Sequence, residues 1–480
     1  MIKERVKALT ESLLDTDDLP SIQTAILRSG EVIYSAAEGY ADREGQVKAD
    51  AQTQYAIGSV TKTFATTAIG LLVERGLVSW DDPVKKVLPE FEMYDRHLTH
   101  QVTLRDIASH RTGLPRHDFM FYQYDKPESE IVNTIREMEP AVELRSRMIY
   151  QNHMFILIGV LVEKLSGMKW QAFVKENLLD PLGMDATTFS VSEMVARPNY
   201  ALPYAGLERA ERIPFKCLDN FGMAAAMNST GEDLLKWLAF HLGNGEWNGK
   251  QIIAPERLLE CHTPQTIIGS RLPWKLPYID FECYGLGWYV ESYRGEKVIY
   301  HSGHVNGFAS LVSFVPGRKI AFAINCNKTF SLAPMTLQYC LYDLLFGLEP
   351  VDWRQKFHDF SAAITQAYAA ELRALRAQQS KNTQPSLSLD AYAGCYRHPA
   401  HGDIHVKAGQ DALYIDYGEL QGPLEHLCYD TFLVTVPVEL FQSPIKFRLD
   451  EKGEVEALEM KVEPVLHKYL TFTKQAIHHP

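Results

Sequence analysis

The segment Gly58–Phe64 reads Gly-Ser-Val-Thr-Lys-Thr-Phe and directly precedes a helix-forming stretch, Ala65–Arg75. Ser59 is therefore expected at or near a helix N-terminus, where a backbone N–H can help hold an oxyanion. Lys62 follows three residues later, about one helical turn, so its amine shares a face with the Ser59 hydroxyl. A serine hydroxyl becomes a competent nucleophile when a neighbouring base takes its proton, and a partly desolvated lysine can be that base.

Serine-x-x-lysine is a weak pattern alone and is more often an N-capped surface turn, so two further motifs matter. Tyr150–Asn152 (Tyr-Gln-Asn) stands at the start of an apolar helical stretch. A tyrosine hydroxyl near a lysine can shuttle a proton, and an asparagine amide can orient both lysine and substrate. His301–His304 (His-Ser-Gly-His) ends a β-rich run. There Gly303 lets a substrate backbone lie close to the strand, and the His304 N–H can supply a second oxyanion donor.

Strand-forming sequence at both ends of the region before residue 350 predicts one antiparallel sheet. Ser21–Ala37 holds two β-rich segments around a turn at Ser29-Gly30, and four short β-rich runs return between Gly285 and Asn325. The sequence between them is mostly helical and includes Leu157–Leu165, which is apolar nearly all round. The economical arrangement is an α+β fold, in which the helical region packs against one antiparallel sheet.

The C-terminal part of the chain predicts a second, all-β domain. Residues 356–379 are expected to form a helix, and the polar stretch 380–386, which contains a proline, reads as a linker. Residues 387–475 are dense in short alternating segments, typical of a barrel or sandwich. We therefore divide the chain into a catalytic domain at 1–349, a helix and linker at 350–386, and a β-barrel domain at 387–480.

Composition and charge exclude several classes of partner. The net charge is -12 and no block of basic residues occurs, which argues against nucleic acid and anionic membranes as partners. The longest strongly apolar run, Met154–Val162, is shorter than the ~18 to 20 residues that span a bilayer. The N-terminus lacks the apolar core of a secretion signal, and the seven cysteines are scattered, so we expect a cytoplasmic protein. The oligomeric state stays open.

Other residue clusters carry less chemistry. His398, His401 and His405 fit no zinc-site spacing and are expected to be solvent-exposed loop histidines, so we expect no metal site. Gly285–Gly287 lacks the third glycine and the helix of a dinucleotide site and is expected to reflect strand geometry, so we expect no cofactor. The aromatic cluster Phe119–Tyr124 either lines the mouth of a cleft or packs into a hydrophobic cluster.

Taken in this order and at these separations, the three motifs resemble those of the serine β-lactamase and penicillin-binding-protein superfamily. They are most similar to its class C, D-aminopeptidase and esterase branch (peptidase S12-like), which has Tyr-x-Asn where class A members have Ser-Asp-Asn. The resemblance covers about residues 10–347 and includes Tyr55–Ser59, Leu104–Pro115 and Tyr284–Trp288. It implies a β-lactamase/transpeptidase-like fold, followed by a lipocalin-like barrel.

The resemblance also implies a role for each matching residue of the three motifs. These residues fall into two groups: one transfers protons or carries the acyl group, and the other binds the oxyanion or the substrate. In the first group Ser59 is the acylated nucleophile, Lys62 its activating partner, Tyr150 the general base and acid, and Asn152 the residue that positions Lys62, with His301 added to this catalytic set. In the second group are the backbone N–H groups of Ser59 and His304, together with Ser302 and Gly303.

One departure narrows the expected activity. His301 stands where many penicillin-recognising members carry a lysine, and a histidine is largely neutral near pH 7, so it offers no permanent cation to a substrate carboxylate. The resemblance therefore implies a serine hydrolase with a Ser59 acyl-enzyme, acting on amide or ester bonds in a small molecule or short peptide, with D-residues expected. Two alternatives stay open: a penicillin-binding-protein-type thioesterase, peptide cyclase or acyltransferase, and a catalytically silent penicillin-binding-like protein.

Overall fold

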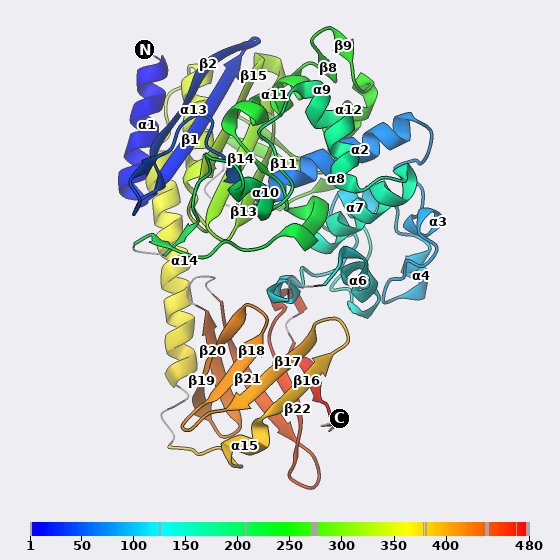
Figure 1. Ribbon diagram of the computed structural model, residues 1–480, viewed down its shortest axis with the longest axis vertical. Helices are drawn as coiled ribbons and strands as arrows, with labels where there is room; N and C mark the ends of the chain where they lie inside the picture. The colour runs from blue at the N-terminus through cyan, green and yellow to red at the C-terminus, as the bar shows by residue number, and fades with distance from the viewer. Residues whose placement is uncertain are drawn as a thin grey trace. The chain divides into compact units, whose positions relative to one another are not determined.

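The computed structural model describes residues 2–123, 126–206, 209–269, 277–377, 379, 382–436, 441–466 and 468–476. The chain divides into two compact units (Figure 1). The first unit comprises Met1–Phe91, Arg96–Gly113 and Val142–Asp359, and the second comprises Glu92–Asp95, Leu114–Ala141 and Phe360–Pro480. Ser380 and Lys381 of the expected linker lie outside the described residues. The domain boundaries that we expect at 349/350 and 386/387 stay a prediction.

The first unit is built on a nine-stranded antiparallel sheet in the order β10-β11-β12-β13-β14-β15-β1-β2-β3. Strand β1 pairs with β15, with Ile22 opposite Cys326, so the N-terminal hairpin joins the late meander as the sequence predicts. The α+β fold is therefore confirmed. The strands are β1 (Ser21–Arg28), β2 (Glu31–Asp42), β3 (Val47–Lys48), β10 (Thr266–Ile267), β11 (Ile279–Tyr284), β12 (Tyr289–Tyr293), β13 (Glu296–Val305), β14 (Phe308–Val315) and β15 (Ile320–Cys326).

Helices cover both faces of this sheet (Figure 1). Ser313 on β14 bonds to Tyr342 of α13, whereas its neighbour Phe314 packs on His241 of α11, so the two helices lie on opposite faces. The helices of this unit are α1 (Ile2–Thr16), α2 (Thr61–Glu74), α3 (Val84–Val87), α4 (Arg96–Thr99), α5 (Leu104–Ala108), α7 (Asn152–Ser166), α8 (Trp170–Val174), α9 (Asp180–Leu182), α10 (Val191–Val195), α11 (Gly231–Leu242), α12 (Pro255–Cys261) and α13 (Ala333–Phe346).

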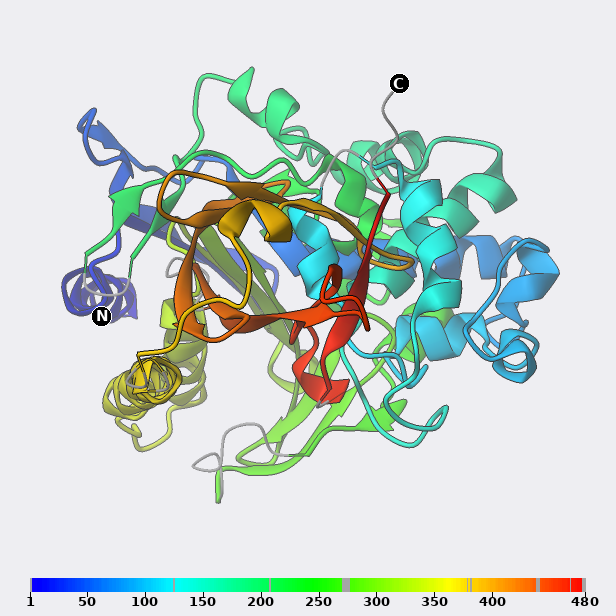
Figure 2. The same ribbon diagram turned by 90° about the horizontal axis from the view of Figure 1, so that it is seen from below.

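The second unit contains a closed eight-stranded antiparallel barrel, which confirms the all-β tail (Figure 2). Its interior is filled by apolar and aromatic side chains, among them Tyr396, Ile415 and Phe472. The long helix α14 (Trp353–Arg376) contributes residues to both units, and α15 (Leu389–Tyr392) precedes the barrel. The barrel strands are β16 (Gly394–His398), β17 (Gly402–Ala408), β18 (Leu413–Tyr417), β19 (Leu420–Cys428), β20 (Thr431–Val436), β21 (Phe441–Leu449), β22 (Val455–Met460) and β23 (Leu470–Lys474).

The second unit also includes a segment from the middle of the chain, Leu114–Ala141. Within it, Phe119 and Tyr122 belong to the hydrophobic core of the barrel. The Phe119 ring stacks on Tyr417 with ring centroids 4.5 Å apart and an interplanar angle of 10°. Of the two interpretations of this aromatic cluster, packing into a hydrophobic cluster holds for these two residues, whereas Tyr124 lies outside the described part of the chain.

Two smaller expectations were wrong. His398 and His405 lie on the strands β16 and β17 and not in loops. His401 is not solvent-exposed but is 1% exposed, and its Nε2 lies 3.0 Å from Nδ1 of His117, because the chain folds the 114–141 segment against the barrel. Gly285–Gly287 forms the bend between β11 and β12 and is not part of a strand. Within the described ranges, no helix is long and apolar enough to cross a membrane.

Candidate active site

Ser59 lies in a short 3-10 turn, Gly58–Val60, that leads directly into α2. One hydrogen bond ties this turn to a distant segment of the chain: the Ile57 N–H donates to the Met227 carbonyl at 3.1 Å. A second hydrogen bond is local, because the Thr61 hydroxyl donates to the Gly58 carbonyl at 2.7 Å. The flanking residues are buried while Ser59 keeps partial exposure, so the hydroxyl is held firmly and remains accessible.

Lys62 projects from the first turn of α2 into a buried position, where it contacts three acceptors. Its Nζ lies 3.0 Å from Ser59 Oγ, 2.8 Å from Asn152 Oδ1 and 2.7 Å from the carbonyl oxygen of Ala224. Three acceptors match the three N–H donors of an ammonium group. A neutral amine in the same place would direct its lone pair towards one of these neighbours, and Ser59 is the one that carries a proton to give. The pair can therefore exchange a proton.

Tyr150 and Asn152 stand at the start of α7, as the sequence predicts. Lys62 Nζ lies 4.9 Å from the centroid of the Tyr150 ring, which places both side chains around the same amine. Tyr150 and Asn152 are partly exposed, whereas the following residues of α7 enter the core. Tyr150 and Asn152 thus lie close to the Lys62 amine, at the accessible end of the buried helix α7.

The third motif lies on β13, against the backbone that precedes Ser59. A Cβ added to Gly303 would lie 1.9 Å from the carbonyl oxygen of Ile57, so only glycine allows this approach. A Cβ on Gly58 would lie 2.9 Å from the backbone nitrogen of His304. The backbone directly before Ser59 is therefore packed against that of Gly303 and His304, which brings β13 close to the turn that carries Ser59.

His301 and Ser302 take different positions on the same strand. His301 is 1% exposed, with Nε2 2.9 Å from the Tyr284 hydroxyl and Nδ1 2.7 Å from the Ser302 carbonyl oxygen. Its ring centroid lies 6.4 Å from that of Tyr150. Ser302 is partly exposed. The side chain of His304, two positions further along the strand, is exposed.

Sequence reasoning missed two contributors to the site. The Ala224 carbonyl, which accepts from Lys62, lies at the end of a turn over Asp219–Ala224. Gly222 within that turn has φ 45° and ψ -132°, a conformation open to glycine. The Ser310 hydroxyl on β14 donates to the Ile57 carbonyl at 2.6 Å and ties the sheet to the turn that carries Ser59. Neither has a recognisable spacing in the sequence, because both act across more than a hundred residues.

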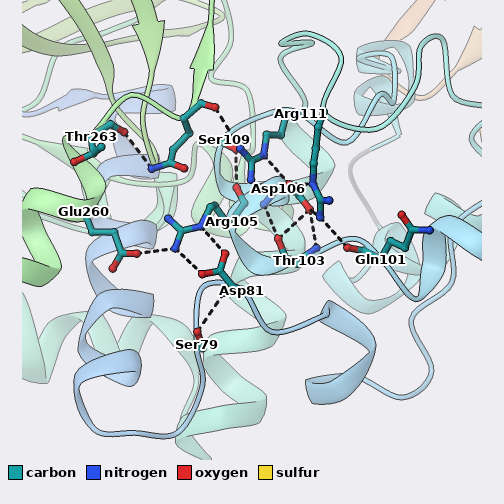
Figure 3. A network of polar contacts seen from close by, with 12 residues as sticks. Ser79, Asp81, Gln101, Thr103, Arg105, Asp106, Ser109, Arg111, Glu260 and Thr263 are labelled. Carbon is teal, nitrogen blue, oxygen red and sulfur yellow. Dashed lines mark hydrogen bonds and ion pairs between the residues drawn. The ribbon is translucent and has the colours of Figure 1, made fainter.

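A buried ionic network lies beside the site, around Asp106 of α5 (Figure 3). Burial alone would raise the pKa of Asp106, but hydrogen bonds from Arg145, Thr103 and Arg111 lower it below its usual value. Arg111 Nε lies 2.6 Å from Asp106 Oδ1, and Arg145 Nη2 lies 2.7 Å from Oδ2. A fully buried carboxylate with two guanidinium partners fixes the chain on both sides of residue 110.

The antiparallel sheet, the serine–lysine pair and the Tyr-x-Asn and His-x-Gly segments around it define a β-lactamase and penicillin-binding-protein type of protein. Residues 6–339 match the family model described as Beta-lactamase, and the chain belongs to this family. Residues 378–474, which hold the barrel, match the Domain of unknown function (DUF3471). The superfamily resemblance drawn from the motifs is therefore confirmed.

Known relatives match the chain over most of its length. The unguisins hydrolase ungD' of Aspergillus campestris is 28% identical over 486 residues, which cover 95% of this chain and 89% of that protein. The octameric penicillin-binding protein homologue from Pyrococcus abyssi has a TM-score of 0.66 at 21% identity, covering 98% of this chain and 99% of that one. The D-amino acid amidase from Ochrobactrum anthropi SV3 has a TM-score of 0.60 at 21% identity, covering 72% and 97%. The two structural likenesses show a shared fold.

Proposed function

We propose that this chain is a serine hydrolase that forms an acyl-enzyme on Ser59 and cleaves amide or ester bonds, with short D-residue-containing peptides as substrates. The observation that carries the proposal is the buried Lys62 amine 3.0 Å from the accessible Ser59 hydroxyl. A nucleophile and base at hydrogen-bond distance, with the base oriented by a third group, is the arrangement that nucleophilic catalysis needs. Asn152 is that third group, at 2.8 Å from the amine.

Acylation begins when Ser59 Oγ attacks the carbonyl carbon of the substrate and its proton passes to the neutral Lys62 amine. Negative charge then develops on the carbonyl oxygen, where the backbone N–H groups of Ser59 and His304 stabilise it. The bond to the leaving nitrogen or oxygen breaks, and the Tyr150 hydroxyl passes a proton to the departing amine or alcohol. Tyr150 regains a proton from the Lys62 ammonium, whose Nζ lies 4.9 Å from the Tyr150 ring centroid.

Deacylation repeats these steps with water in place of the serine. The Tyr150 hydroxyl gives its proton to the Lys62 amine, which is neutral again, and accepts one from the water, whose oxygen attacks the ester carbon on Ser59. Collapse of the second tetrahedral intermediate releases the acid and returns the proton to Ser59. Every residue in this cycle precedes residue 305, so we assign the activity to the region 1–349.

The substrate side of the site favours compounds without a free carboxylate beside the scissile bond. His301, which occupies the position of the substrate-binding lysine in many relatives, is buried and has both ring nitrogens at hydrogen-bond distance from Tyr284 or Ser302. Amides and esters suit such a site. The names of two similar proteins, an unguisins hydrolase and a D-amino acid amidase, support the same class of chemistry.

The test combines intact-mass measurement with turnover assays. Wild-type protein and Ser59→Ala are each incubated with a reactive penicillin, then with D-aminoacyl amides and small esters. We expect an acyl adduct or Ser59-dependent turnover in wild type alone, with melting temperatures nearly equal. Turnover retained by Ser59→Ala would contradict the proposal. Adding an amine acceptor separates hydrolysis, which yields the free acid, from acyl transfer, which yields a new amide.

A further inference from the structure

His110 follows α5 and has a backbone conformation that few residues adopt. Its φ is 56°, in the left-handed region that favours glycine and asparagine. Its side chain is fully buried, at 0% exposure. The Asp106 network holds the chain on either side, since Arg111 and Arg145 both bond to that carboxylate. The Arg145 N–H also donates to the Arg111 carbonyl at 2.7 Å. A backbone conformation of this kind persists only where the surrounding contacts fix it, as they do here.

His110 contacts the chain on both sides of Tyr150. Its carbonyl oxygen accepts a hydrogen bond from the Ile149 N–H at 2.9 Å. Its ring nitrogen Nδ1 accepts one from the Gln151 N–H at 3.1 Å. One residue therefore bonds to the main-chain N–H groups of the residues directly before and after Tyr150, through its own main chain on one side and its side chain on the other. Because Nδ1 accepts, the imidazole carries its proton on Nε2 in this arrangement.

The His110 ring also packs directly against the Tyr150 side chain. The two ring centroids are 4.2 Å apart, with an interplanar angle of 35°. The same ring contacts Phe155 at 5.0 Å and Tyr284 at 4.8 Å, so His110 is itself held among three aromatic side chains. Lys62 Nζ lies on the Tyr150 ring, 4.9 Å from its centroid. A small shift of the Tyr150 ring would therefore change its distance to Lys62.

We propose that His110 is a positioning residue for Tyr150: its carbonyl and Nδ1 clamp the backbone on both sides of the tyrosine and set where the phenol stands relative to Lys62. The inference rests on the proposed function, in which Tyr150 carries the proton. His110 acts through Tyr150 and touches no reacting atom. Its loss should slow proton transfer and leave substrate binding largely intact, because a misplacement of about 1 Å at a catalytic group costs up to ~100-fold in rate.

Two variants separate the clamp from simple packing. His110→Asn supplies Oδ1 as an acceptor in place of Nδ1 and tolerates the left-handed backbone. His110→Phe keeps a ring of similar size and removes the acceptor. We expect His110→Phe to lower kcat more than 10-fold with KM within about 3-fold of wild type, and His110→Asn to stay within about 3-fold in kcat. Equal kcat in wild type and His110→Phe, or an equal large loss in both variants, would overturn the proposal.

A double-mutant cycle adds a readout that a merely structural role would not move. In a Tyr150→Phe background, His110→Phe should cause little further loss of kcat, because the group it positions is already gone. A further loss as large as in the wild-type background would contradict the proposal. If His110→Phe does not fold, His110→Asn decides: near-wild-type kcat supports the clamp, and a fall above 10-fold at unchanged melting temperature overturns it.

The assay distinguishes failure of this inference from failure of the proposed function. All variants are measured on a substrate that wild type turns over and Ser59→Ala does not. If no substrate meets that condition, the proposed hydrolysis fails. The rate at which a fluorophosphonate modifies Ser59 is then measured in place of kcat. That rate reports on the same proton transfer, because the serine must lose its proton to attack the phosphorus atom. The same order is expected, with His110→Asn close to wild type and His110→Phe slow. Absence of both turnover and labelling would overturn both proposals.

Discussion

The carbonyl oxygen of Ala224 accepts a hydrogen bond from Lys62 Nζ at 2.7 Å, although 162 residues separate the two. With Ser59 Oγ and Asn152 Oδ1, it gives the amine three acceptors in a buried position. A flexible side chain is thereby held in one place, since a buried nitrogen bonded on three sides has few other conformations open to it. The lysine beside the proposed nucleophile is consequently fixed by main-chain and side-chain groups from three parts of the chain.

Lys62→Arg should abolish most turnover. Arginine keeps the positive charge and the donors but does not lose its proton at accessible pH, so it cannot act as a base. We expect kcat to fall by about 100-fold or more. Steady-state turnover of an amide or ester checks this, with circular dichroism as the control for folding. Activity within a few-fold of wild type would show that Lys62 serves only as a cation.

Gly303→Ala should impair both stability and activity. The added Cβ would lie 1.9 Å from the Ile57 carbonyl oxygen, so β13 must move away from the turn that carries Ser59. Overpacking of this kind costs about 1 to 3 kcal/mol. Gly422→Ala is the matched control, since nothing lies within 4 Å of its added Cβ. Chemical denaturation and turnover of both variants test this, and equal behaviour would contradict the close approach of β13.

Phe119→Ala should destabilise the barrel, although residue 119 precedes the first barrel strand by more than two hundred residues. Its ring stacks on Tyr417 inside the hydrophobic core of the second unit. Truncation of a buried phenylalanine costs about 3 to 5 kcal/mol. Tyr414→Ala, at a side chain 46% exposed on β18, serves as the control. Hydrogen exchange of the β17–β19 amides should accelerate in the first variant alone, and unchanged exchange there would count against the packing of residue 119.

The buried His241–His262 pair should make the protein less stable in acid. Burial lowers the pKa of His262 from 6.5 to about 3, and that of His241 well below 6.5. Between pH 6.5 and about 3 the unfolded chain therefore binds a proton at His262 that the folded protein does not. Above pH 6.5 the free energy of unfolding is not reduced by this effect. As the pH decreases below 6.5, the free energy of unfolding decreases by up to about 1.4 kcal/mol per pH unit for each such histidine.

His262→Gln tests this pH dependence. Urea denaturation between pH 7 and pH 4 should give a free energy of unfolding that falls less steeply in the variant, by about 1.4 kcal/mol per pH unit. The comparison uses slopes, so a constant loss of stability from the substitution itself does not affect it. Parallel curves for the two proteins would place the acid sensitivity elsewhere.

Short-range patterns predicted the elements well. The hairpin around Ser29-Gly30, the buried helix after Tyr150 and the all-β character of the C-terminal domain follow from turn residues, apolar periodicity and alternation. The spacing of Ser59 and Lys62 also placed their side chains together, because three residues make about one helical turn. The catalytic roles of these residues stay predictions.

Short-range patterns did not predict contacts between segments that are far apart in the sequence. Nothing local to Phe119 indicates that it packs in a barrel formed from residue 394 onward. The burial of His401 has no local signal either, because its partner, His117, lies 284 residues away. The Ala224 carbonyl leaves no trace in the sequence at all, since any residue can supply a backbone oxygen.

The sequence by itself determined which groups of this protein can do chemistry and which elements carry them, because helix and strand periodicity act over a few residues. Only the tertiary structure decided how tightly these groups are held: Lys62 by Ala224, and Tyr150 by the peptide and ring of His110. Those contacts depend on distances between segments that meet only when the whole sheet and its helices pack. These contacts form because a buried polar group is stable only when it is hydrogen-bonded, so each one pairs with a group that the fold brings close to it.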